Sequence, residues 1–110
     1  MAKPSVSAEC GCAADVRKAV AVDPGAKTRN LNRLKRIEGQ VRGLQRMVDG
    51  DRYCADILTQ LSSVQEALRA VGRELMRNHL RHCAAEAIRT GGTPADLMFE
   101  ELVDLMERHR

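Results

Sequence analysis

The chain has 110 residues, of which 30% are charged and 2% are aromatic, and its formal net charge is +3. Helix-forming residues dominate, and the aromatic and β-branched content is too low for a β-sandwich or β-barrel. No apolar run approaches the roughly 18 residues of a membrane span and no signal peptide is visible, so we expect a soluble, cytoplasmic, all-α protein.

The N-terminal quarter of the chain differs in composition from the rest. We predict that residues 1–27 form a flexible arm and that residues 28–110 form one helical domain. The arm contains Pro4, Gly11 and the pair that begins at Pro24, all of which are unfavourable inside a helix.

The first helix is predicted to begin near Thr28 as its N-cap and to end at Gly50. Between residues 27 and 46, seven basic residues are opposed only by Glu38. Such a local excess of positive charge favours an acidic partner, most commonly nucleic acid. An apolar stripe with helical spacing follows the same segment: Leu31, Leu34, Ile37, Val41, Leu44 and Val48.

The second helix determines the expected architecture. It is predicted to run from residues 51–53 to Thr90 without a proline, and a helix of roughly 37 residues spans about 55 Å. That length is about twice the diameter of a compact domain of this size, so a second copy must cover its ends. A third helix is predicted from Thr93 as N-cap, with Pro94 at its first position.

A cysteine and histidine constellation lies on the long helix. His79 and Cys83 are four residues apart and share a face, whereas Cys54 is about 37 Å away along a straight helix. Two long helices that cross antiparallel near residues 67–68 would bring Cys54 of one chain to His79 and Cys83 of the other. The two-fold symmetry then produces two equivalent sites.

Two thiolates and one imidazole form a soft ligand set that suits Cu(I) or Zn(II). Three ligands satisfy a trigonal Cu(I) ion, whereas Zn(II) would need a fourth ligand, either water or a thiolate from the arm. Ni(II) would also need four, typically with further nitrogen donors. The ligand count favours Cu(I) and leaves Zn(II) and Ni(II) open.

Three blocks of sequence carry a family resemblance: the run from Leu31 to Gly43, the pair Tyr53-Cys54, and Asn78-His79-Leu80 with Cys83. With these blocks, residues 28–107 resemble the copper-sensing repressors of the CsoR/RcnR family. The resemblance implies an all-α protomer with a long central helix, an antiparallel dimer that forms a four-helix bundle, and a homotetramer built as a dimer of dimers. It further implies binding to operator DNA and release when Cu(I) binds Cys54, His79 and Cys83 at the dimer interface.

The same resemblance implies further functional residues. Tyr53 and Glu101 would form a shell of hydrogen bonds around His79, and Glu101 lies on an otherwise apolar stripe where an unpaired carboxylate is unfavourable. A copper chaperone is a further candidate partner. The implied DNA surface consists of basic residues of the first two helices: Arg33, Lys35, Arg36, Arg42, Arg69 and Arg73.

Several alternatives stay open at this point. A nickel-responsive repressor of the same family is one, and a helical protein that buffers copper or zinc without binding DNA is another. An enzyme is not expected, because no phosphate-cradling glycine loop and no acid/base pair in a plausible cleft are evident. Cys10 and Cys12 match no motif of the family, and they form either a pair of reduced thiols or a Cys-x-Cys element that collects copper.

Overall fold

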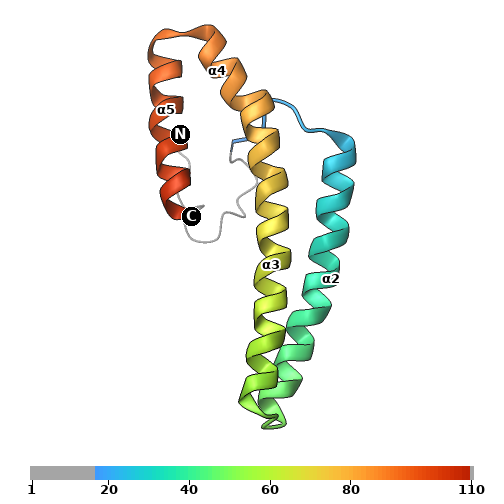
Figure 1. Cartoon of the computed structure of the whole chain (residues 1–110). Helices are drawn as coiled ribbons and strands as arrows, with labels where there is room; N and C mark the ends of the chain where they lie inside the picture. Colours follow the sequence, from blue (N-terminus) through green and yellow to red (C-terminus); the bar gives the residue numbers. More distant parts are fainter. Residues whose placement is uncertain (1–16, 110) are drawn as a thin grey trace, which may run out of the picture.

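The computed structural model describes residues 17–109, and this part of the chain is helical from Pro24 onward (Figure 1). The described residues contain no strand, which confirms the expected all-α protomer of three helices with the long one in the centre. The elements are α2 (Pro24–Asp49), α3 (Cys54–Asn78), the π-helical segment η1 (His79–Ala84), α4 (Ala85–Thr90) and α5 (Gly92–Arg108).

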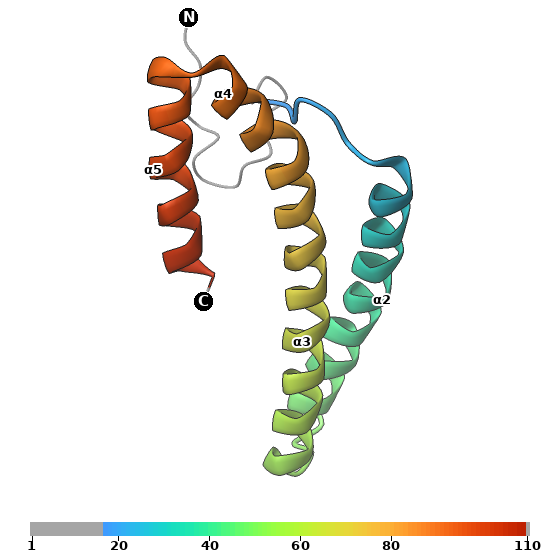
Figure 2. The ribbon, with the colours of Figure 1, turned by 45° about the horizontal axis from the view of Figure 1, so that its top comes forward.

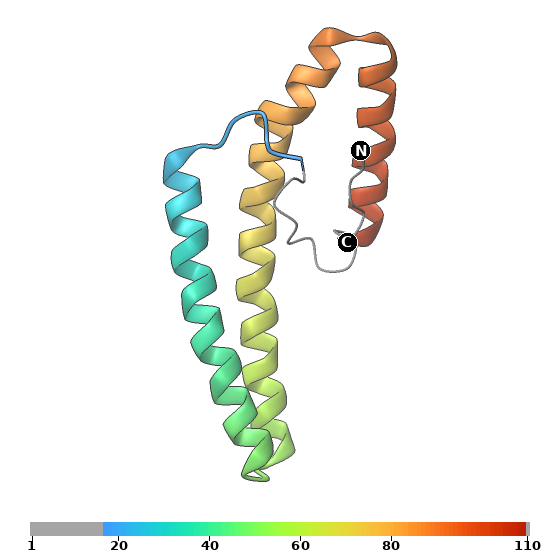
Figure 3. The same cartoon turned by 180° about the vertical axis from the view of Figure 1, so that it is seen from behind.

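α3, η1 and α4 follow one another without a break and form a single helical rod. The described chain extends over 55 × 29 × 27 Å, so its longest dimension matches the length predicted for the central helix. α2 runs antiparallel to α3, close to it at the connecting turn and further from it at the other end (Figures 1 and 3). α5 folds back and packs mainly on α4 (Figure 2).

α2 begins four residues before the predicted Thr28, so that prediction was wrong and residues 24–27 are helical. Asp23 is extended (φ −70°, ψ 118°), and its carbonyl accepts the N–H of Lys27 at 3.0 Å. Pro24 occupies the first helical position, where its fixed φ suits the helix and its missing N–H leaves no intrahelical bond unmade. Residues 1–16, with Cys10 and Cys12, lie outside the described residues, so the flexible arm stays a prediction.

The two connections between helices use left-handed backbone. Asp51, which follows Gly50, carries the positive φ of the α2–α3 turn (53°). At the start of α5, Gly91 and Gly92 have φ of 77° and 61°, a region that glycine enters without steric cost. α5 therefore begins at Gly92, and its N-cap is Gly91, two residues before the predicted N-cap Thr93.

The hydrophobic interior of one chain is small. Between α2 and α3 it consists of Ile37, Val64 and Val71, with Leu44 and Ala67 partly buried against them. No large side chain in the described part of the chain is fully buried. None of the described helices has an apolar stretch long enough to cross a membrane.

A second apolar stripe of α3 faces away from this interior. Leu61, Leu68 and Leu75 are 39%, 47% and 58% exposed, although their spacing of seven residues places them on one face. Contiguous exposed apolar surface of this kind marks an interaction site. A single chain therefore leaves the middle of its longest helix uncovered.

Candidate metal centre

The candidate ligands His79 and Cys83 lie in η1, where the rod changes from α-helical to π-helical hydrogen bonding. Single π turns within α-helices are frequent at functional sites. The continuous helical run predicted to Thr90 is confirmed, whereas the π segment was not predicted. A π-helical turn is wider than an α-helical turn. His79 and Cys83 are therefore not related by the α-helical i, i+4 geometry that was assumed from the sequence.

A carboxylate from α5 reaches the imidazole of His79. Oε2 of Glu101 lies 2.9 Å from Nε2 of His79, with 35% and 23% of the two side chains exposed. The pair lacks the alignment of a hydrogen bond, so Nε2 remains a buried nitrogen without a hydrogen-bond partner. The structure thus places Glu101 beside His79, as the resemblance implies, and its approach to Nε2 leaves Nδ1 as the nitrogen for a metal.

The segment before α2 passes beside Cys83. The backbone N–H of Val20 points to Sγ of Cys83 at 3.4 Å. The carboxamide of Asn78 holds this segment on both sides, since its oxygen accepts the N–H of Asp23 at 3.1 Å and its nitrogen donates to the carbonyl of Ala21 at 3.0 Å. Sequence reasoning missed these contacts; the position of Asn78 directly before His79 was the only available signal.

The third candidate ligand lies at the opposite end of α3. Cys54 is the first residue of this helix and is exposed, and the neighbouring Tyr53 is 75% exposed. The structure of one chain brings neither residue to His79. Among the described residues, no three His, Cys, Asp or Glu side chains are grouped so that they could hold a metal ion. One chain therefore brings together only two of the three predicted ligands, His79 and Cys83.

The donors at the η1 end fit a soft metal ion. Cys83 is half-buried and half-buried His79 is supported by a carboxylate, a combination of thiolate and imidazole that suits Cu(I) or Zn(II) and disfavours Mg(II) or Ca(II). A thiolate from a second chain would complete three ligands.

The residues predicted to contact DNA divide into two groups by their partners. Arg42 lies 3.3 Å from Glu38, and Arg69 and Arg73 share Glu66 at 3.1 and 3.5 Å. The described residues provide no carboxylate within ion-pair distance for the others, which are Arg33, Lys35 and Arg36.

Comparison with known proteins identifies relatives that are named copper-sensing transcriptional repressors. The copper-sensing transcriptional repressor CsoR of Bacillus subtilis is 49% identical over 82 residues, which cover 74% of this chain and 79% of the relative. The copper-sensing transcriptional repressor RicR of Mycobacterium tuberculosis is 50% identical over 70 residues, 64% of this chain and 73% of the relative.

Two solved structures share the fold. The copper-sensing repressor CsoR with Cu(I) from Geobacillus thermodenitrificans matches with a TM-score of 0.72 and 43% identity, over 84% of this chain and 97% of that chain. A variant of the formaldehyde-responsive regulator FrmR from Salmonella enterica serovar Typhimurium matches with a TM-score of 0.63 and 27% identity, over 82% and 100%.

The resemblance stated from the sequence is confirmed by these findings and by a family model described as metal-sensitive transcriptional repressor, which matches residues 26–108. Members of this family are regulators that act on DNA, and they are not enzymes. From its helical fold, its sequence and its match over most of its length, this chain belongs to the metal-sensitive transcriptional repressors.

Proposed function

We propose that this chain is a Cu(I)-responsive repressor, which binds operator DNA without the metal and is released when Cu(I) binds between two protomers. The observation that carries the proposal is the placement of the soft ligands, with His79 and Cys83 at one end of the helical rod and Cys54 at the other. The copper-sensing relatives support the choice of metal.

The exposed stripe of α3 supports the antiparallel pairing independently of the ligands. Leu61 and Leu75 are equally far from Leu68 along the chain, so pairing about Leu68 covers Leu61 with the partner's Leu75. Cys54 and position 82 are also equally far from Leu68. The pairing that buries the apolar stripe therefore carries Cys54 to the η1 segment of the second copy.

In this arrangement Cys54, His79 and Cys83 would hold the metal, and Cu(I) would supply a link between the two protomers. Glu101 orients the ring of His79 and ties α5 to the site. Tyr53, beside Cys54, would approach this His79 from the second chain. A coupling free energy of about 1–3 kcal/mol between metal and DNA would weaken DNA binding, and DNA would weaken metal binding by the same amount.

We further propose that the working form is a homotetramer in the cytoplasm, built as a dimer of dimers, with a copper chaperone as a candidate donor. Besides the α3 stripe, α2 and α5 carry exposed apolar side chains, which offer surface for more than one interface. These are Val41, Val48, Leu97 and Val103.

A mixing experiment tests the shared site. Cys54→Ala and Cys83→Ala protomers are refolded separately and together, and Cu(I) is titrated anaerobically against labelled promoter DNA while its anisotropy is recorded. Neither variant alone has a complete site, whereas a mixed dimer has one complete site and one that retains only His79. Random mixing should restore tight Cu(I) binding at about a quarter of the wild-type site number.

Failure of the mixture to bind more Cu(I) than the separate variants would show that the ligands are not shared between chains. In the wild-type protein, DNA that stays bound after Cu(I) has loaded would remove copper as the inducer and make Ni(II) the next titrant. Absence of DNA binding even at low salt would favour a copper- or zinc-buffering protein.

A further inference from the structure

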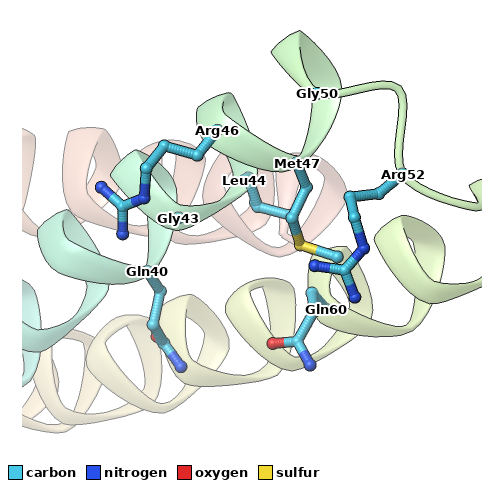
Figure 4. Close-up of a pocket in the computed structure, with 8 residues that line it drawn as sticks. All are labelled: Gln40, Gly43, Leu44, Arg46, Met47, Gly50, Arg52 and Gln60. Carbon is cyan, nitrogen blue, oxygen red and sulfur yellow. The ribbon is translucent and has the colours of Figure 1, made fainter.

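A pocket of about 390 Å³ lies at the α2–α3 turn, at the opposite end of α3 from His79 (Figure 4). Arg46 and Arg52 stand on opposite sides of Met47, and the carboxamides of Gln40 and Gln60 lie along one edge of the pocket. Both helices and the turn between them therefore contribute polar groups to one concavity.

The pocket is positively charged and no carboxylate lines it. In the described part of the chain, Arg46 has no carboxylate partner, and Arg52 has only Asp56, at 4.0 Å. A guanidinium group binds phosphate oxygens with two parallel N–H donors, and carboxamides add further donors. This combination is suited to an oxyanion.

Gly43 forms part of the pocket wall and lies inside α2. A Cβ built there would meet nothing closer than Nη2 of Arg46, at 3.9 Å, so the packing of this chain does not require glycine. Glycine disfavours a helix interior relative to alanine, and it leaves the backbone open to close approach. A bound group that comes close to the helix surface would account for the glycine at position 43.

The pocket continues the face of α2 that carries the proposed DNA surface. Gln40, Gly43 and Met47 follow Arg33 and Arg36 at spacings of three and four residues, which places all five on one side of the helix. A DNA strand that follows the basic part of this face therefore meets the pocket next.

We infer that the turn pocket binds a backbone phosphate of operator DNA, held by the guanidinium groups of Arg46 and Arg52 and approached closely over Gly43. The inference rests on the proposed function, because it takes DNA as the partner. It extends the DNA surface beyond the predicted residues to the end of the α2–α3 hairpin.

Variants of the pocket test the inference through the salt dependence of DNA binding. Arg46→Gln and Arg52→Gln should each weaken DNA binding about 5- to 20-fold at low salt, and each should reduce the slope of log K against log salt by about one. Arg89→Gln is the matched control, because Arg89 is exposed on α4 and paired with Glu86 at 2.9 Å. Gly43→Ala should weaken DNA binding while leaving the thermal midpoint equal or higher.

The inference would be overturned if the pocket variants kept the wild-type salt slope, or if they lost no more DNA affinity than Arg89→Gln does. Neither result would argue against DNA binding by the protein itself. A titration with inorganic phosphate tests the pocket without DNA. It should shift the side-chain amide resonances of Gln40 and Gln60 in a saturable manner, and the shifts should vanish in the Arg46→Gln/Arg52→Gln double variant. If wild-type protein binds no DNA, the proposed function fails, and phosphate shifts that persist in the double variant would overturn the pocket as well.

Discussion

Glu101 is the carboxylate through which α5 contacts the candidate metal centre, and Glu100 beside it is exposed. Glu101→Gln keeps the shape of the side chain but removes the charge that faces Nε2 of His79. We expect Cu(I) affinity to fall about 10- to 100-fold, the usual effect of removing a group that supports a metal-bound histidine. Competition with a Cu(I) chelator measures the loss, and Glu100→Gln should match the wild type. Equal affinities for both variants would show that Glu101 does not support the ligand.

Glu66 holds two of the predicted DNA-contacting arginines, Arg69 and Arg73, in exposed ion pairs. Such pairs contribute little to stability, so Glu66→Gln should leave the fold intact and make both guanidinium groups available to phosphate. We expect DNA binding about two- to tenfold tighter, with a steeper salt dependence. Filter binding at several salt concentrations measures both. The control is Glu86→Gln on α4, and weaker binding by Glu66→Gln would indicate that the carboxylate positions the arginines instead.

Most of the candidate site residues could be predicted from residue type, spacing and the family resemblance. Cys54, His79 and Cys83 could be proposed because few side chains are soft ligands. Glu101 came from the family resemblance, and its place on an otherwise apolar stripe is consistent with a paired carboxylate. The contact of Val20 with Cys83 could not be predicted, because a backbone N–H has no side-chain signature and the two residues are 63 apart in sequence. The roles of the ligands stay predictions that the metal titrations test.

Among the elements, the existence and order of the helices followed from the periodicity of apolar residues, whereas their ends and local geometry did not. The pair beginning at Pro24 looked unfavourable for a helix, yet proline at the first position starts α2. The π turn from His79 to Ala84 changes hydrogen bonding without changing composition or apolar spacing. Neither feature could be separated from an ordinary helix by pattern alone.

Asn78 joins the segment before α2 to the end of α3, through hydrogen bonds to Ala21 and Asp23. Asn78→Ala should leave the helices intact, because alanine favours a helix, but should release this segment. We expect the amides of Val20 and Asp23 to exchange with solvent about tenfold faster in the metal-free protein. Hydrogen exchange followed by NMR measures the change, and Arg77→Ala on the neighbouring position is the control. Unchanged exchange would mean that other contacts hold the segment.

For the molecule as a whole, the expectation of an assembly came from the predicted length of the central helix, about 55 Å, which exceeds what one chain of 110 residues is expected to cover. The small interior formed by Ile37, Val64 and Val71 agrees with that argument. The pairing itself stays a proposal, since the described chain shows only the surface that would be covered.

Leu68 lies at the centre of the exposed α3 stripe, where two copies would meet on the symmetry axis. Leu68→Glu places two like charges in that contact and removes two apolar side chains, each of which contributes about 1.5–3 kcal/mol when buried. We expect dissociation and loss of helical content at micromolar protein concentration. Sedimentation and circular dichroism measure the two effects. Ser62→Glu, on the polar side of the same helix, should remain associated and folded.

The position of Cys54 and of His79 and Cys83 at opposite ends of one helix has a consequence for when the protein can respond. Under the proposed pairing, a newly made chain has no complete site and does not compete for the metal until it finds a second copy. The concentration of competent sites then rises with the square of the chain concentration while most chains are single. When the chain concentration is too low for dimers to form, such a sensor does not bind its inducer. The abundance of the protein then sets the lowest metal level to which a cell can respond.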